Sequence, residues 1–114
     1  MPFHIKRVYE PSAPTDGFRV LIDRLWPRGL TKEAAAIDLW AKDLSPSHEL
    51  RKWFDHDPAR WSEFQTRYIA QIRHQTETLA TLKREAKRRR VTLVFASREE
   101  RLNNAAALKR FLQK

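Results

Sequence analysis

Four stretches of the chain have the apolar pattern of β-strands. Residues 5–9 alternate apolar and basic side chains with a period of two, which predicts a strand with one solvent-facing side near a sheet edge. Residues 18–23 and 91–96 are rich in β-branched and other apolar residues, so they predict strands covered on both faces. Residues 37–44 fit a strand or a helix, and the Ser45-Pro46-Ser47 turn after them favours a strand.

Between these stretches, apolar residues recur at spacings of three and four and predict helices. The first expected helix covers residues 31–36 and is capped by Thr31, and the second is capped by Ser45 or Ser47 and carries Leu50, Trp53 and Phe54. The third begins at Asp57-Pro58 and carries Trp61, Phe64, Tyr68 and Ile72. The fourth begins at about Thr76 and buries Leu79, Leu82 and Ala86, and the last begins with Ser97 and Glu100 as a capping box.

Alternating strands and helices predict one α/β domain over residues 1–114, with a small, mostly parallel sheet of three to four strands flanked by helices. The first strand has two open alternatives. It pairs either parallel or, through the Asp16-Gly17 turn, antiparallel.

Composition narrows the class of protein. With 114 residues, 41% hydrophobic and 32% charged, the chain has the length and balance of a small globular domain with one core. No apolar run approaches the roughly 18 residues of a membrane helix, and no apolar segment marks secretion. The chain has no cysteine, which excludes disulfides, thiol nucleophiles and thiolate-bound metals, and we expect a cytoplasmic protein.

Positive charge is concentrated in one segment. The 23 Lys and Arg residues against 14 Asp and Glu give a net charge of +9, which favours anionic partners. Residues 83–90 contribute +5 of it, because Glu85 offsets one of six basic residues: Lys83, Arg84, Lys87, Arg88, Arg89 and Arg90. This run is explained either as a solvated helix end that complements the helix dipole or as a nucleic-acid-binding surface, although no known nucleic-acid-binding motif accompanies it.

Polar side chains follow the predicted strands at their carboxyl ends, where open α/β sheets bind ligands. These side chains are Asp23, Arg24, Trp26, Arg28, Lys42, Asp43, Ser97 and Arg98. Arg24 and Arg28 offer planar donors that suit a carboxylate or phosphate, and Gly29 either lets the backbone approach a ligand or adopts a positive φ. The structural alternative pairs Arg24 with Asp23 or Asp43 and buries Trp26 beside Pro27.

Spacing limits other kinds of chemistry. Asp23 and Asp43 are a candidate acid–base pair if one carboxyl is desolvated, whereas simple pairing with arginines is the structural alternative. The four histidines, at positions 4, 48, 56 and 74, share no metal-ligand spacing, so we expect no metal. Because glycine occurs only at positions 17 and 29, glycine-rich phosphate-binding loops are impossible, and we expect no cofactor.

Several motifs resemble a known family. They are Arg7-Val8-Tyr9-Glu10, Asp16-Gly17-Phe18-Arg19-Val20-Leu21, Asp23-Arg24-Leu25-Trp26-Pro27-Arg28-Gly29-Leu30, Trp40-Ala41-Lys42-Asp43-Leu44-Ser45-Pro46-Ser47 and Leu50-Arg51-Lys52-Trp53-Phe54. Over nearly the whole chain they resemble the YeaO-like branch of the domain of unknown function family 488. The resemblance implies a small bacterial α/β protein without an established activity. Its signature positions would be Asp23, Arg24, Trp26, Pro27, Arg28, Gly29, Lys42, Asp43, Pro46 and Ser47.

The wider family has a cysteine-containing pattern near its last strand and helix. Ala96-Ser97-Arg98 and Asn103-Asn104 stand in that region here, so we expect no thiol chemistry.

The leading hypothesis is an anion site for a phosphorylated or carboxylated small molecule. Its cations would be Arg24, Arg28, Lys42 and Arg98, with Trp26, Gly29 and Ser47 as further ligand-binding positions. If the protein is an enzyme, Asp23 or Asp43 is the candidate acid–base group. The alternative is nucleic-acid binding through residues 83–90, and a third hypothesis is a subunit that binds a protein partner. The sequence leaves the substrate, the reaction and the oligomeric state open.

Overall fold

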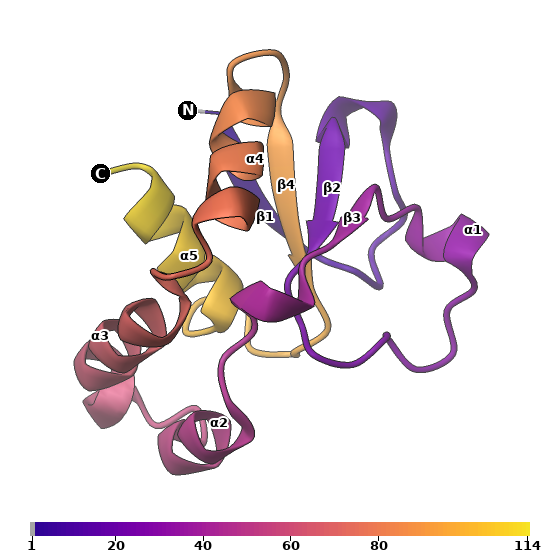
Figure 1. Ribbon diagram of the computed structural model, residues 1–114. Helices are drawn as coiled ribbons and strands as arrows, with labels where there is room; N and C mark the ends of the chain where they lie inside the picture. Colours follow the sequence, from indigo (N-terminus) through magenta and orange to yellow (C-terminus); the bar gives the residue numbers. More distant parts are fainter. Residues whose placement is uncertain (1) are drawn as a thin grey trace.

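The computed structural model describes residues 2–114, and Met1, which the sequence places in the same domain, lies outside the described part. Four strands form one sheet in which every pair of neighbours is parallel (Figure 1). Their order across the sheet is β1 (Phe3–Arg7), β4 (Val91–Phe95), β2 (Phe18–Leu21) and β3 (Leu39–Trp40). The α/β prediction is therefore confirmed, and the open question about the first strand is settled in favour of parallel pairing.

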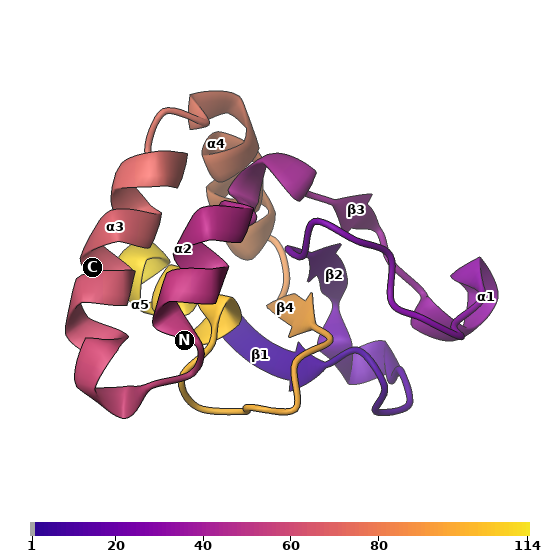
Figure 2. The same ribbon diagram turned by 90° about the horizontal axis from the view of Figure 1, so that it is seen from below.

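Helices cover the two faces of the sheet unequally. Residues 2–114 contain five α-helices: α1 (Lys32–Ala35), α2 (His48–Phe54), α3 (Trp61–Ile72), α4 (Thr76–Ala86) and α5 (Asn104–Leu112). Figures 1 and 2 show α3, α4 and α5 together on one side of the sheet, whereas α1 lies on the other side beside β3. No helix in residues 2–114 is long and apolar enough to cross a membrane.

The larger core lies between one face of the sheet and helices α2, α3, α4 and α5. Inward-facing residues of the strands, such as Val20, Leu93 and Phe95, pack there against Phe64, Tyr68 and other residues of the helices. A smaller cluster on the opposite face contains Val8, Leu21, Ala35 and Val94, with Trp26 and Trp40 packed against it. The two clusters explain why β2 and β4 are buried on both faces and apolar apart from Arg19 and Thr92, as the sequence predicts for central strands.

Short 3₁₀ turns replace parts of the predicted elements. The strand expected over residues 37–44 is only Leu39–Trp40, because Lys42–Leu44 turns into a 3₁₀ helix. A second 3₁₀ helix, Pro58–Arg60, leads into α3 and is capped by Asp57, whose carboxylate accepts a hydrogen bond from Ala59 N. The third, Pro14–Asp16, precedes β2.

Most predicted helix caps are confirmed, and one is wrong. Thr31 caps α1, and Ser47, one of the two candidates, caps α2. The final helix does not begin at Ser97. Ser97 Oγ accepts a hydrogen bond from Glu99 N within a turn, and the N-cap of α5 is Asn103, which accepts from Ala106 N at 2.8 Å.

Gly17 joins the 3₁₀ helix to β2 at a position that requires glycine. Its φ is +69°, and a Cβ there would lie 2.2 Å from the carbonyl oxygen of Arg90. The close approach follows from a hydrogen bond between Phe18 N and the same carbonyl, which fixes the beginnings of β2 and β4 side by side. Any larger residue at position 17 would separate these strand ends.

Candidate functional site

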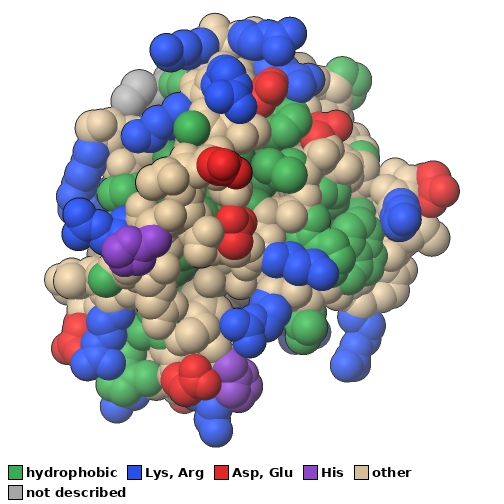
Figure 3. Space-filling model, viewed as in Figure 1, with side chains coloured by type: hydrophobic (Ala, Val, Ile, Leu, Met, Phe, Trp, Pro, Cys, Tyr) green, Lys and Arg blue, Asp and Glu red, His purple; other side chains and the backbone are tan. Residues whose placement is uncertain are grey.

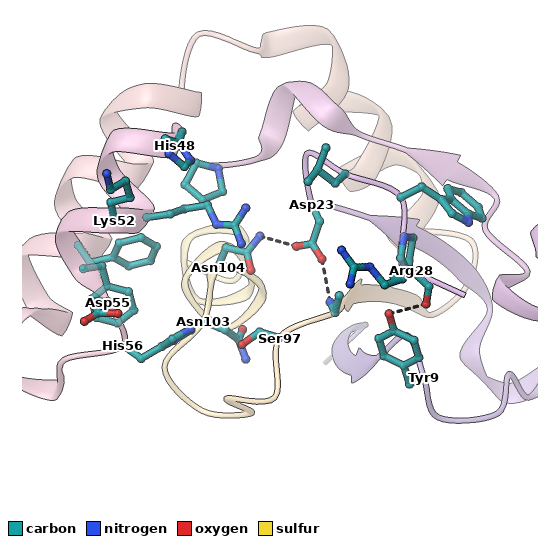
Figure 4. Close-up of a pocket in the computed structure, with 18 residues that line it drawn as sticks. Tyr9, Asp23, Arg28, His48, Lys52, Asp55, His56, Ser97, Asn103 and Asn104 are labelled. Atoms are coloured by element: carbon teal, nitrogen blue, oxygen red, sulfur yellow. Dashed lines mark hydrogen bonds between the residues drawn. The ribbon is translucent and has the colours of Figure 1, made fainter. Parts of the chain in front are cut away.

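A pocket of about 800 Å³ lies at the carboxyl ends of the strands. One wall comes from the segments that follow β1, β2 and β4, and the opposite wall comes from α2 and the residues after it (Figure 4). The beginning of α5 contributes Asn103 and Asn104 between the two walls. The position agrees with the general rule for open parallel sheets, in which ligands bind beyond the carboxyl ends of the strands.

Asp23 links three elements at the centre of this pocket. One carboxylate oxygen, Oδ2, accepts a hydrogen bond from Ala96 N at 2.8 Å, and Oδ1 accepts one from Asn104 Nδ2 at 3.1 Å. Burial raises the pKa of Asp23, while the hydrogen bonds from Ala96 and Asn104 and the charge of Arg51 oppose that rise. Within residues 2–114, no lysine or arginine forms a close ion pair with this carboxylate.

The loop after β2 is held in place by side-chain contacts of two tryptophans, Trp26 and Trp40. Trp40 Nε1 donates to the backbone oxygen of Asp23 at 2.8 Å, and Trp26 Nε1 donates to the backbone oxygen of Leu30 at 2.8 Å. The two indole rings meet edge to face with centroids 5.4 Å apart. Tyr9 Oη donates to the backbone oxygen of Arg28 at 2.9 Å, so the guanidinium of Arg28 extends from a fixed backbone.

The α2 wall is fixed from behind. Tyr68 of α3 is fully buried and donates through Oη to the backbone oxygen of Leu44 at 2.5 Å. Burial, together with the charge of Asp23, raises the pKa of Tyr68, which keeps the hydroxyl protonated as a donor. Ser47 Oγ caps α2 through Leu50 N and also accepts from Gln71 Nε2 at 2.9 Å.

A polar stripe on α2 borders the pocket. His48, Arg51 and Lys52 are spaced as i, i+3 and i+4, so they share one side of the helix, and Asp55, the residue after α2, also lines the pocket. At the end of α2, Asp55 and His56 have φ values of +46° and +53°, and both line the pocket. Two successive left-handed residues without glycine are costly, and such strain concentrates at functional sites.

The sequence-predicted site residues divide into two groups. Asp23, Trp26 and Arg28 line the pocket together, as does Ser97. The other predicted residues, Arg24, Gly29, Lys42, Asp43, Ser47 and Arg98, are not among its lining residues.

The members of the second group have other surroundings. Arg24 and Arg98 are exposed. Lys42 Nζ lies 4.0 Å from the centroid of the Trp40 ring, and Asp43 accepts a hydrogen bond from Thr78 Oγ1 at 2.6 Å. Gly29 has φ of +82°, and no heavy atom lies within 4 Å of the place that a Cβ would occupy, so backbone conformation is what favours glycine there. The structure thus does not bring Asp43 into the pocket with Asp23.

Comparison with known proteins places the chain in a family. A family model described as the inactive DUF488-N3 subclade matches residues 2–114. This chain belongs to that subclade. The resemblance to the YeaO-like branch of family 488 is also confirmed, because the uncharacterized protein YeaO of Escherichia coli is 36% identical over 113 residues, which cover 99% of this chain and 98% of YeaO.

Mycobacterial relatives of this DUF488-N3 protein are similar over nearly the same length. The uncharacterized proteins Rv3073c of Mycobacterium tuberculosis and Mb3100c of Mycobacterium bovis are each 43% identical over 108 residues, covering 95% of this chain and 91% of the relative. No solved structure gives a significant match.

The sequence analysis did not predict that residues of α2, or Asn103 and Asn104 at the beginning of α5, would line the pocket. The polar stripe of α2 was detectable as an i, i+3, i+4 pattern opposite the buried Leu50 and Phe54. Asn103 and Asn104 had no comparable signal, because their role depends on where α5 begins. Among residues 2–114, no group of three or more His, Asp or Glu side chains is placed to hold a metal ion.

Proposed function

We propose that this protein binds a small phosphorylated or carboxylated ligand in the pocket at the carboxyl end of its sheet. The observation that carries the proposal is a pair of guanidinium groups lining one pocket, Arg28 from the loop after β2 and Arg51 from α2. Neither guanidinium makes a hydrogen bond or a close ion pair with any other part of residues 2–114. Both are therefore available to an external anion.

The surroundings of the two arginines support an anionic ligand. Planar guanidinium groups match carboxylate and phosphate oxygens geometrically, and Lys52 adds a third cation against two carboxylates, Asp23 and Asp55. The N-terminus of α5 lies at the pocket, where the positive end of the helix dipole also favours an anion. The arginines, Lys52 and the helix end come from separate elements, and each of them favours a negatively charged ligand.

Binding without turnover is the form of this function that we favour. The subclade is described as inactive. The two carboxylates that could have formed an acid–base pair, Asp23 and Asp43, do not line the same pocket. Asp23 also has both oxygens engaged by Ala96 N and Asn104 Nδ2, which supports a role in holding the site together.

Titration calorimetry with inorganic phosphate and with small carboxylates tests the proposal. Loss of one charge-assisted hydrogen bond costs about 1.5–3 kcal/mol, so Arg28→Gln and Arg51→Gln should each weaken binding by about tenfold to a hundredfold. Arg88→Gln is the matched control, because it removes the same charge from an exposed residue outside the pocket. Equal weakening in all three variants would show that only the net charge matters and would refute the site.

Arg24→Gln tests the expectation that came from the sequence alone. Arg24 is exposed and outside the pocket lining, so this variant should bind phosphate with nearly wild-type affinity. A loss as large as that of Arg28→Gln, with Arg88→Gln unchanged, would contradict this expectation and would place Arg24 in the site, as the sequence predicts.

A second candidate function is nucleic-acid binding, which we propose for the six basic residues of the run 83–90. All six are exposed, and Figure 3 shows Lys and Arg side chains gathered at the end of the molecule where α4 leads into β4. Arg89 pairs with Glu85, whereas the others make no ion pair within residues 2–114. Oligonucleotide binding that weakens steeply with salt is the expected result.

A further inference from the structure

The pocket holds hydrogen-bond acceptors beside its cations, and this combination narrows the class of ligand. Asp23 accepts one hydrogen bond on each carboxylate oxygen, from Ala96 N and from Asn104 Nδ2. A carboxylate has about four lone-pair sites, so roughly two remain for donors outside the protein. Figure 4 shows Asp23 at the pocket between Asn104 and Arg28.

Asn104 provides a second acceptor whose orientation is fixed. Its Nδ2 donates both to Asp23 Oδ1 and to the backbone oxygen of Ile22, each at 3.1 Å, and only the amide nitrogen can serve two acceptors. The amide oxygen must therefore point away from them. In residues 2–114 the one buried side-chain oxygen without a donor is Gln113 Oε1, so the undonated Oδ1 of Asn104 is open to solvent.

A bare anion is poorly matched to this arrangement. Its charge would suit Arg28 and Arg51, but a carboxylate has no donor for Asp23 or Asn104 Oδ1, and a phosphate bound between the two arginines has no second group that reaches these acceptors. A ligand that carries hydroxyl groups as well as an anionic group matches both the cations and the acceptors, because each hydroxyl donates one hydrogen bond.

We propose that the ligand is a polyhydroxylated phosphate ester of the sugar phosphate class. Its phosphate binds Arg28 and Arg51, and its hydroxyls donate to Asp23 and Asn104. The pocket volume of about 800 Å³ leaves room for the carbon skeleton as well as the phosphate. This inference rests on the anion site proposed above and adds the part of the ligand that the acceptors select.

Calorimetric titration of the wild-type chain with ribose 5-phosphate, ethyl phosphate and inorganic phosphate tests the inference. We expect ribose 5-phosphate to bind at least about tenfold more tightly than ethyl phosphate, which has no hydroxyl group and differs by at least one good hydrogen bond. Equal affinities for the two esters would overturn the inference and leave the anion site intact. If neither ester nor inorganic phosphate binds, the anion site itself is refuted.

The variant Asn104→Ala distinguishes the binding of the hydroxyl groups from the binding of the phosphate. The variant should bind ethyl phosphate like the wild type but lose most of its preference for ribose 5-phosphate, while Arg28→Gln should weaken both esters equally. Circular dichroism and thermal unfolding establish that Asn104→Ala is folded, and the wild-type comparison of the two esters decides the matter without any variant. An Asn104→Ala protein that keeps the full preference for ribose 5-phosphate would overturn the assignment of the hydroxyl site.

Discussion

Arg19 is a charged residue inside a central strand, and its surroundings explain how the fold accommodates it. The residue is only 3% exposed. Its guanidinium pairs with Asp16 at 2.6 Å and donates to the backbone oxygens of Ala35 and Ala36 at the end of α1. Lys6 of β1 also reaches Asp16, at 3.1 Å. A buried charge is tolerated only when paired and hydrogen-bonded in this way, so Arg19 and Asp16 tie α1 to the sheet.

The Asp16 carboxylate makes the stability of the protein depend on acid pH. Burial by itself would raise its pKa, but hydrogen bonds from Ala13 N, Lys6 and Arg19 outweigh burial and lower the pKa below its ordinary value. The unfolded chain therefore binds a proton first as the pH falls. We expect the contribution of Asp16 to the free energy of unfolding to be present above about pH 4 and to be lost as the pH falls through the folded-state pKa.

Urea unfolding of the wild type and of Asp16→Asn, between about pH 6 and about pH 3, measures this contribution. The variant should be less stable at the upper pH and should lose less stability on acidification. The comparison also cancels Asp23, whose raised pKa acts in the opposite sense and adds stability as the pH falls. Parallel curves for the two proteins would show that the pair with Arg19 and Lys6 does not depend on the charge of Asp16.

The beginning of α5 can be tested at the scale of a helix cap. Asn103 Oδ1 accepts from Ala106 N, and its Nδ2 donates to the backbone oxygen of Glu99 at 2.7 Å. Asn103→Ala should lower the free energy of unfolding by about 1–2 kcal/mol, the usual cost of a lost N-cap. Ser97→Ala removes only the acceptor for Glu99 N in a turn and should stay within about 0.5 kcal/mol. Chemical unfolding of both variants decides which residue caps the helix, and the reverse ranking would contradict the observed helix start.

Elements with strong local signals were predictable from the sequence. The apolar, β-branched run 91–96 indicated β4, whose five residues are all buried. The alternating run 5–9 indicated an edge strand, and the observed edge strand β1 begins and ends two residues earlier, at Phe3–Arg7. Thr31, Ser47 and Asp57 cap their helices as their residue types indicate, since capping depends on a backbone N–H only two or three residues away. Interactions between residues so close in the chain can be predicted from the sequence without knowledge of the fold.

The composition of the pocket was less predictable because it depends on contacts between distant segments. Ser97 and Asn103 are both good capping residues, and the choice between them follows from packing that links Asn104 to Ile22 and Asp23, 82 and 81 positions away. Likewise, the carboxyl-end rule located Asp23 and Arg28, but no local pattern could show that α2 would place Arg51 opposite them. The wall of the candidate site that follows the strands could therefore be predicted from the sequence, whereas the wall formed by α2 could be recognised only in the three-dimensional structure.

At the scale of the whole molecule, the two candidate functions belong to opposite ends of the sheet. All strands are parallel, so their carboxyl ends share one edge, where the pocket lies. The basic run 83–90 ends directly before β4, and the Arg90 backbone oxygen accepts from Phe18 N at the beginning of β2. The run is therefore at the amino ends of the strands, and substitutions at one end should leave binding at the other end unchanged.

Single-stranded DNA binding measured at about 50 and about 200 mM salt tests the basic end. The suitable variant is Lys83→Gln with Lys87→Gln and Arg88→Gln, because Arg89 pairs with Glu85 and lies over the Phe18 ring at 4.8 Å. If the run binds phosphates, wild-type affinity should fall steeply with salt, and loss of three contacts should reduce the slope of log K against log salt by about 2.

Arg28→Gln is the matched control for this measurement, because it removes a pocket cation and leaves the basic run intact. It should keep the DNA affinity and salt slope of the wild type, whereas the triple variant should keep the phosphate affinity of the pocket. DNA binding that is insensitive to salt, or equal in the triple variant and the wild type, would refute a nucleic-acid-binding role for the run. A surface of exposed cations binds DNA mainly through the release of counterions, so a true interface here must show that salt dependence.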